Sequence, residues 1–153
     1  MSTVGEFRTA LRMQCKGAFL GRGGENRRTE NVVIVTDGAT RKPLFRLYVK
    51  KARDRHGSQG YFWGLNENHL TWLNERPPWW LVLLCGTQEE GYIGTAEQVN
   101  QCVSSGKWPL QWSIQPSRSE YKVHETSIPR EFSKCQSFQD IFTTLGCQRN
   151  SSS

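Results

Sequence analysis

The residues best suited to chemistry are the cations of one short segment. Residues 41–56 hold seven Lys and Arg against the single acid Asp54. Residues 1–40 carry six Lys and Arg against four acids, and residues 57–153 carry seven against nine, so this segment equals the whole net charge of +6. Clustered cations bind polyanions because they neutralise phosphates and release counterions. The segment therefore predicts a partner with a phosphate backbone; the alternative is a solvated edge strand whose lysines deter aggregation.

A second group of cations lies in a glycine-rich stretch. Lys16, Arg22, Arg27 and Arg28 are spread through residues 16–28, where four glycines permit unusual backbone conformations. We expect a flexible basic loop here. The Gly-Arg-Gly-Gly run lacks the spacing of phosphate-cradling glycine motifs, which argues against nucleotide binding.

The elements that must position these cations follow from apolar spacing and from breaker residues. The first half of the chain predicts a helix, a hairpin of two strands, a third strand, a helix halted by Pro77 and Pro78, and a buried strand. Their expected ranges are 6–13, 31–36, 44–51, 61–64, 67–75 and 79–85. The second half predicts strands at 92–94, 110–114 and 121–125 and helices at 95–103 and 137–145.

The strand at 44–51 alternates in character. Phe45, Leu47 and Val49 share one face because side chains alternate with period two. Arg46, Tyr48 and Lys50 share the other. We therefore expect one face in the core and one outward cationic face. Together the elements predict an α/β (α+β) fold, a single domain over 1–147 with a mixed central sheet flanked by helices, and a loose polar tail at 148–153.

The order helix, strand, strand, strand, helix, strand, with Tyr48-x-Lys50 on a middle strand, resembles the αβββαβ core of the PD-(D/E)XK, or restriction-endonuclease-like, superfamily. The resemblance covers about half of the chain. In that family a carboxylate starts one strand and an acidic-x-Lys triplet lies on the next, an arrangement suited to metal-assisted phosphodiester hydrolysis. Here Asn31 and Tyr48 stand where the acids are expected.

The departure from the family's pattern implies an eroded metal site. Mg²⁺ prefers hard oxygen ligands, and an amide and a phenol do not replace two carboxylates. The sequence therefore predicts no metal ligand and no cofactor, with Mg²⁺ required only if the chain is an active endonuclease. For that alternative the catalytic candidates are Asp37 and Lys50, and Glu6 or Glu30 would have to complete the metal site.

The resemblance and the charge together predict a groove that binds the backbone of duplex DNA. The predicted nucleic-acid contacts are Arg22, Arg27, Arg28, Arg46, Tyr48, Lys50, Lys51, Arg53, Arg55, His56, Tyr61 and Trp63. Arg22 to Arg28 would form a mobile clamp, while Tyr61 and Trp63 would stack on a modified or extruded base. Trp108 is also expected to be free for stacking, whereas the core-like positions of the other tryptophans predict burial: Trp72, Trp79, Trp80 and Trp112.

Compartment and class follow from what the chain lacks. It shows no secretory signal and no apolar run long enough to span a bilayer, so we expect a cytoplasmic protein with no membrane partner. The five cysteines form no metal-ligand spacing with the three histidines and are expected to be buried free thiols. His69 is expected to be structural.

The leading hypothesis is a DNA-binding module with an endonuclease-like core, which would suit the recognition part of a restriction or defence system. Its alternatives are an active Mg²⁺-dependent endonuclease and a protein or glycan interaction domain that uses exposed tryptophans. The sequence leaves open whether the target is DNA or RNA, and whether the chain forms a homodimer or is part of a larger protein.

Overall fold

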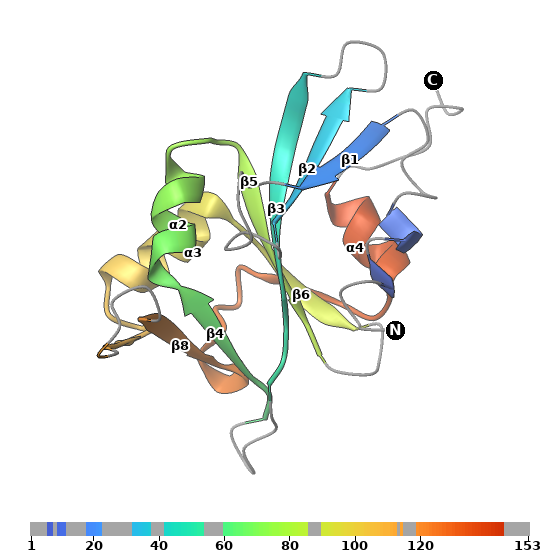
Figure 1. Cartoon of the computed structure of the whole chain (residues 1–153). Coiled ribbons are helices and arrows are strands. Elements are labelled where there is room, and N and C mark those ends of the chain that lie inside the picture. Colours follow the sequence, from blue (N-terminus) through green and yellow to red (C-terminus); the bar gives the residue numbers. More distant parts are fainter. Residues whose placement is uncertain are drawn as a thin grey trace.

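The computed structural model describes residues 6, 7, 9–11, 18–22, 32–37, 42–53, 60–85, 90–112, 114 and 119–145. Its centre is a six-stranded sheet in the order β1-β2-β3-β5-β6-β9 (Figure 1). These strands are β1 (Ala18–Arg22), β2 (Val32–Asp37), β3 (Pro43–Lys51), β5 (Trp79–Leu84), β6 (Gly91–Thr95) and β9 (Ser133–Cys135). Only the β3–β5 pair is parallel among them, so the sheet is mixed, as predicted.

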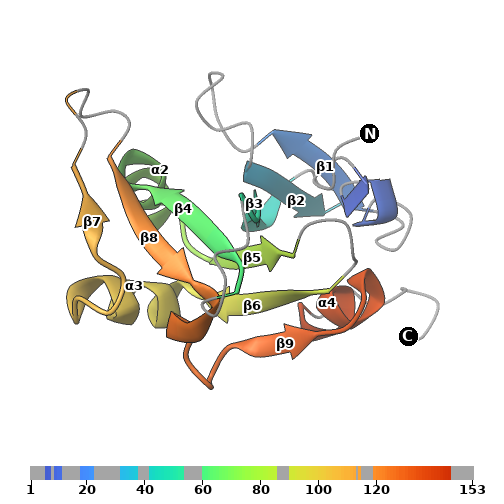
Figure 2. The same ribbon diagram turned by 90° about the horizontal axis from the view of Figure 1, so that it is seen from below.

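A second, three-stranded sheet lies against the first (Figure 2). It has the order β4-β8-β7, with β4 (Phe62–Asn66), β7 (Leu110–Gln111) and β8 (Glu120–His124) all antiparallel. This arrangement corrects two expectations. The strand predicted at 61–64 belongs to the second sheet, and part of the predicted basic loop at 16–28 forms β1, which pairs with β2 along its whole length.

The helices form where capping and breaker residues predict them. Asn66 caps α2 (Glu67–Asn74), since its side chain accepts hydrogen bonds from the backbone N–H groups of Asn68 and His69. Thr95 and Gln98 form a capping box at the start of α3 (Ala96–Ser104). Ser137 caps α4 (Phe138–Thr144), and a 3₁₀ turn spans Glu125–Ser127. No helix within the described ranges has both the length and the apolar character needed to cross a membrane.

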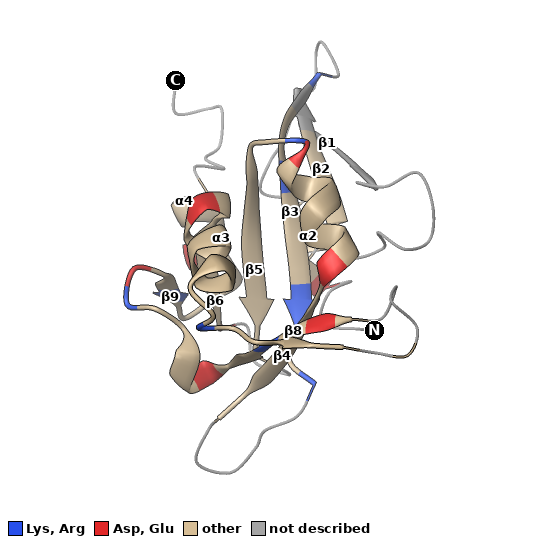
Figure 3. Ribbon diagram, turned by 90° about the vertical axis from the view of Figure 1, so that its left-hand side faces the viewer, with Lys and Arg blue, Asp and Glu red and all other residues tan. Residues whose placement is uncertain are grey.

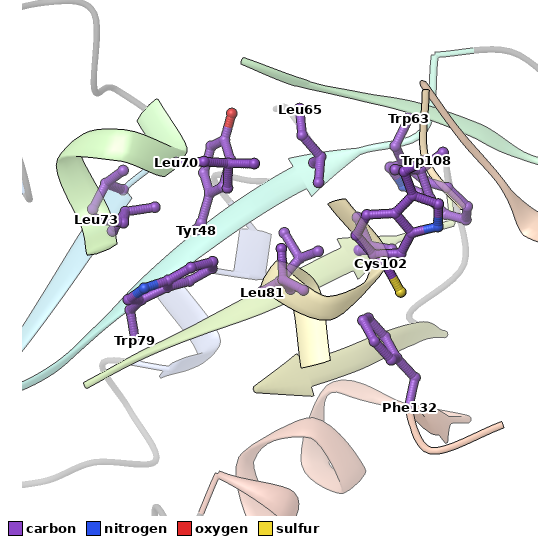
Figure 4. Packing of buried hydrophobic residues seen from close by; sticks show 14 of the residues in the cluster. Tyr48, Trp63, Leu65, Leu70, Leu73, Trp79, Leu81, Cys102, Trp108 and Phe132 are labelled. Carbon is purple, nitrogen blue, oxygen red and sulfur yellow. The ribbon is translucent and has the colours of Figure 1, made fainter. Parts of the chain in front are cut away.

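Helices cover both faces of the central sheet, so the molecule has two cores (Figure 1). One face packs against α4 and the helical residues near Phe7 and Leu11; we call this the apolar core. The other packs against α2, α3 and the second sheet; we call this the mixed core (Figure 4). The chain is a single α+β domain with helices on both sides of a mixed sheet, which confirms the predicted fold class.

The alternation of side chains along β3 is confirmed, but the expected exposure of the face that holds Tyr48 is not. Leu47 and Val49 lie in the apolar core, with Phe45 packed against it. Tyr48 lies on the opposite face, where α2 covers it and its side chain is 0% exposed. The prediction of an outward cationic face was therefore wrong, because α2 and the second sheet pack over that face instead of leaving it open to solvent.

The aromatic and cysteine predictions meet mixed outcomes. Trp63 and Trp108 were expected to be free for stacking but are fully buried, whereas Trp112, which was expected in the core, is 73% exposed. Trp79 is buried as predicted. The cysteines whose side chains are described are buried free thiols, which confirms the expectation for Cys85, Cys102 and Cys135.

Candidate functional site

Three cations surround one carboxylate at the end of β3, and Figure 3 shows this end beside β4 and β8. The carboxylate is Glu120, at the start of β8. The cations are Lys50 on β3, Arg53 just after it and Lys122 on β8. We call these four side chains the Glu120 cluster. With three cations against one carboxylate, its net charge is +2.

The strongest contact in the cluster is between Arg53 and Glu120. Arg53 donates Nη1 to Oε1 at 2.8 Å and Nη2 to Oε2, a bidentate pair. Hydrogen bonding to the Glu120 carboxylate raises the pKa of Arg53. Burial raises the pKa of Glu120, but the hydrogen bond and charge of Arg53, with the charges of Lys122 and Lys50, outweigh it and leave the pKa below its ordinary value. Glu120 is therefore held ionised.

The backbone of the second sheet gives this carboxylate its place. In the β4–β8 register Gly64 lies opposite Lys122, two positions from the pair of Asn66 and Glu120 and on the same face of the sheet. A Cβ built at Gly64 would lie 2.8 Å from Oε2 of Glu120. Because glycine has no side chain there, the carboxylate can lie over β4 and reach Arg53.

Lys50 is less exposed to solvent than Arg53. Its side chain is half-buried, and its Nζ lies 5.8 Å from the centroid of the Tyr48 ring. Burial and the nearby charge of Arg53 lower the pKa of Lys50, and Glu120 offsets part of that effect. An anion that approaches this ammonium would relieve the same unfavourable environment.

A chain of hydrogen bonds formed by the Tyr48 hydroxyl lies next to Lys50. The Tyr48 hydroxyl accepts from the backbone N–H of Asn66 at 3.1 Å and lies 3.2 Å from Nδ1 of His69. Burial raises the pKa of Tyr48, so its hydroxyl keeps its proton and can donate it to Nδ1. Burial and the charge of Lys50 lower the pKa of His69 to about 4, which keeps the imidazole neutral and able to accept. This chain fixes the start of α2 against β3.

Lys122 covers an aromatic ring at the surface of the second sheet. Its Nζ lies 4.7 Å from the centroid of the Phe62 ring, and its side chain is half-buried. Lys51 follows Lys50 at the end of β3 and is exposed. The end of β3 thus presents cations from β3, from the residues after it and from β8.

The other predicted contacts lie elsewhere. Arg46 lies by the C-terminal end of α2: its Nη1 donates to the carbonyl of Arg76 at 3.2 Å, and its guanidinium lies 5.6 Å from the Trp72 ring centroid. Tyr48 and Trp63 are fully buried, so solvent does not reach these two predicted contacts. Tyr61 is half-buried beside Trp63.

For six of the predicted residues the structure describes no side chain. Arg22 belongs to β1 and Asp37 ends β2, but their side chains are not described. Arg27, Arg28, Arg55 and His56 lie outside the described residues.

The two catalytic candidates are not brought together. Thr36 pairs with Pro43, so Asp37 lies beside the start of β3, whereas Lys50 is seven residues further along the strand. At about 3.3 Å per residue this separation is roughly 20 Å. Among the described residues there is no group of three His, Cys, Asp or Glu side chains in a metal-binding arrangement.

Sequence reasoning missed Glu120, Lys122 and Trp112. The i, i+2 spacing of Glu120 and Lys122 predicts that they share a face of a strand, but no local signal shows that this strand pairs with β4 and reaches Arg53. Comparison with protein-family models, curated proteins and solved structures finds no significant match for this chain. What the Glu120 cluster can do follows from its own charge and geometry: it can hold an oxyanion such as a phosphate.

Proposed function

We propose that this chain binds DNA by holding backbone phosphates at the Glu120 cluster and at the neighbouring Lys51. The observation that carries the proposal is the convergence of three cations on one carboxylate, Glu120, at the end of the strand that holds the chain's excess charge. The single negative charge of Glu120 neutralises one of the three positive charges. The remaining charge of the cluster is suited to an anion from outside the chain.

Phosphate chemistry fits these particular side chains. The Arg53 guanidinium already makes a bidentate contact with an oxyanion, Glu120, and a phosphate offers the same geometry with more negative charge. Lys50 and Lys122 add point charges from two different strands. Such contacts set the position of a nucleic acid without reading its sequence.

The proposed interface is shifted from the one expected from the sequence. It lies at the end of β3 rather than along its covered face, and Lys50, Lys51 and Arg53 remain among its contacts. A restriction-endonuclease-like core remains part of the proposal, since β2 begins beside Tyr48 on β3, which is the adjacency that the resemblance implies. Tyr48 itself supplies no carboxylate there, so the proposed activity is binding without cleavage.

The test is fluorescence anisotropy of labelled DNA against salt concentration, for the wild type and for Lys122→Ala. Removing one phosphate contact should weaken binding and make the slope of log affinity against log salt shallower by about 1. Lys134→Ala is the matched control, because Lys134 is also a strand lysine over an aromatic ring, 5.8 Å from the Tyr92 centroid, but lies on β9 at the far edge of the sheet. It should leave the slope unchanged.

A second variant should change the DNA affinity in the opposite direction. Glu120→Gln removes the competing carboxylate and raises the net charge of the cluster, so DNA should bind more tightly. Equal losses in Lys122→Ala and Lys134→Ala, or weaker binding in Glu120→Gln, would contradict the proposed site. Reactions with Mg²⁺ run on a gel should show uncut DNA.

A further inference from the structure

Two arginine side chains lie against one tryptophan ring at the C-terminal end of α2. The guanidinium of Arg76 lies 4.2 Å from the centroid of the Trp72 ring, and the guanidinium of Arg46 lies 5.6 Å from it. We call Arg46 and Arg76 the arginine pair. A guanidinium that is stacked on an aromatic face loses little further conformational freedom when it binds an oxyanion, so the pair is arranged in advance for such a ligand.

The positive charge of the arginine pair is only partly compensated by the described residues around it. Arg46 Nη1 donates to the carbonyl of Arg76 at 3.2 Å, and Arg76 Nη1 donates to the carbonyl of Trp72 at 2.8 Å. These bonds cap the end of α2, but a carbonyl carries no formal charge. Glu75, whose Oε1 lies 3.4 Å from Nη1 of Arg76, supplies one negative charge, and its side chain is exposed. One positive charge of the pair therefore remains at this end of the helix.

The Arg46 guanidinium lies in an environment that is unfavourable for its charge. Within the described part of the chain its Nε is buried without a hydrogen-bond partner. Burial and the charge of Arg76 also lower the pKa of Arg46. An anion bound beside the pair offsets both the burial of this charge and its repulsion from Arg76. The side chain of Arg76 is 36% exposed, which gives such an anion access to the pair.

The arginine pair and the Glu120 cluster lie at opposite ends of α2, on the same face of β3 (Figure 3). Arg46 and Lys50 are four residues apart on β3, so alternation with period two puts both side chains on the face that α2 covers, with about 13 Å between their Cα atoms. The length of α2 is about 12 Å, measured from the end where Asn66 pairs with Glu120. One strand of duplex DNA carries a phosphate every 3.4 Å or so along the helix axis, so this separation corresponds to about four base pairs.

We propose that the arginine pair binds a second backbone phosphate of the same DNA molecule that the Glu120 cluster holds. The inference rests on the proposed function and deepens it, because it names the substrate class: a continuous nucleic-acid backbone that extends over at least about four base pairs. With about 13 Å between the two sites, inorganic phosphate or a mononucleotide fills one site only, whereas a DNA strand spans both.

The experiment measures the anisotropy of a labelled duplex, longer than the separation of the two sites, against salt concentration for Arg76→Gln. The glutamine removes the positive charge but keeps a side-chain N–H group that can donate to the carbonyl of Trp72, so α2 should stay capped. The slope of log affinity against log salt should become shallower by about 1, with an affinity about tenfold lower at moderate salt. The double variant with Lys122→Ala should lose about 2 in slope, because contacts this far apart act independently.

The matched control is Arg130→Gln. Arg130 is an exposed arginine in the segment that leads into β9, three strands from β3 in the central sheet. The control removes the same charge from the same residue type and should leave the salt slope unchanged. An equal change of slope in Arg130→Gln would show a general effect of net charge and would overturn the inference.

Glu75→Gln tests the same site without touching the hydrogen bonds of either arginine to α2. It removes the one carboxylate beside Arg76, so DNA should bind more tightly. This variant keeps the inference open to test if urea unfolding shows that Arg76→Gln is much less stable than the wild type. Unchanged or weaker DNA binding in Glu75→Gln would contradict a phosphate at the arginine pair.

The two proposals fail in different ways. If Arg76→Gln keeps the wild-type slope while Lys122→Ala makes it shallower, the second site is overturned, the Glu120 cluster stands, and the arginine pair serves only to cap α2. If Lys122→Ala keeps the wild-type slope, or the wild type binds no DNA at moderate salt, the proposed function itself fails, and the inference, which needs both sites, fails with it.

Discussion

The two faces of the central sheet are covered by different chemistry. In the apolar core, aromatic rings of α4 pack on the helical segment near the N-terminus: Phe7 lies 5.4 Å from both Phe138 and Phe142 between ring centroids. Apart from the Cys135 thiol, the described buried side chains of this core are apolar. In the mixed core, Tyr48 and three indole N–H groups are buried with hydrogen-bond partners.

This difference separates stability from positioning. An apolar contact holds a helix on a sheet but tolerates small shifts, whereas a buried hydrogen bond fixes both partners because leaving either unpaired is costly. The hydrogen bonds of the mixed core fix α2 and the second sheet relative to β3 and β5, and the Glu120 cluster lies where β3 and the second sheet meet. Within the described part of the chain, no hydrogen bond of this kind joins the apolar core to the cluster.

The largest expected effect tests the apolar core. Phe142→Ala removes a ring that is 3% exposed and packs on Phe7, so the free energy of unfolding should fall by about 4 kcal/mol. The salt slope of DNA binding should not change while the protein remains folded. Urea unfolding followed by circular dichroism measures the first quantity, and anisotropy measures the second. Thr143→Ala, at the neighbouring exposed position, should change neither the free energy of unfolding nor the salt slope by much. A changed salt slope in Phe142→Ala would contradict the separation of stability from positioning.

A smaller effect is expected in the mixed core. Tyr48→Phe removes the hydroxyl that contacts the N–H of Asn66 and Nδ1 of His69, leaving two half-buried polar groups without that partner. The free energy of unfolding should fall by about 2 kcal/mol. DNA binding should weaken as well, because α2 and Lys50 lose their fixed position.

The control for Tyr48→Phe is Tyr92→Phe. The Tyr92 hydroxyl is half-buried and donates to Oε2 of Glu125 at 2.6 Å, so its loss leaves a carboxylate oxygen that water can reach. The expected cost is below about 1 kcal/mol, with no change in DNA binding. An equal effect of the two variants would mean that the buried chain at Tyr48 does not position the site.

The sequence predicted the local elements because their signals are local. Asn66 and Thr95 cap α2 and α3, and the alternation of β3 placed Leu47 and Val49 in one core. It did not predict what covers Tyr48, because that depends on how α2 and the second sheet pack on β3, and the second sheet pairs β4 with β8, whose residues are about 60 positions apart in the chain. The residues beside an aromatic residue in the sequence do not show whether its side chain is buried or exposed. For this reason Trp63 was predicted to be exposed and Trp112 to be buried, whereas the structure shows the reverse.

The cation-rich segment was found from composition, but the arrangement of its side chains around Glu120 required the tertiary structure. Lys50 and Arg53 are close in sequence, whereas Glu120 and Lys122 come from a strand of the second sheet. Charge counting finds an excess, since it needs no geometry. It does not find the carboxylate that holds Arg53 in place.

The smallest expected effect is the pH dependence of the stability, which should come from His69 in the mixed core and not from the apolar core. His69 has a pKa of about 4 in the folded protein, below its ordinary value of 6.5, because of burial and the charge of Lys50. The unfolded state therefore binds more protons between these values, so the stability from the neutral imidazole is fully present above about pH 6.5 and is lost as the pH falls toward 4.

For a half-buried ring we expect this loss to be about 1 to 2 kcal/mol after allowing for solvent screening. Urea midpoints measured at neutral pH and near pH 4.5 should differ less in His69→Gln than in the wild type, because the glutamine cannot take up the proton. Phe142→Ala should keep the wild-type difference, since its core contains no histidine among the described residues. A His69→Gln protein with the full wild-type pH dependence would place the proton uptake elsewhere and would remove the neutral imidazole from the chain that supports Lys50.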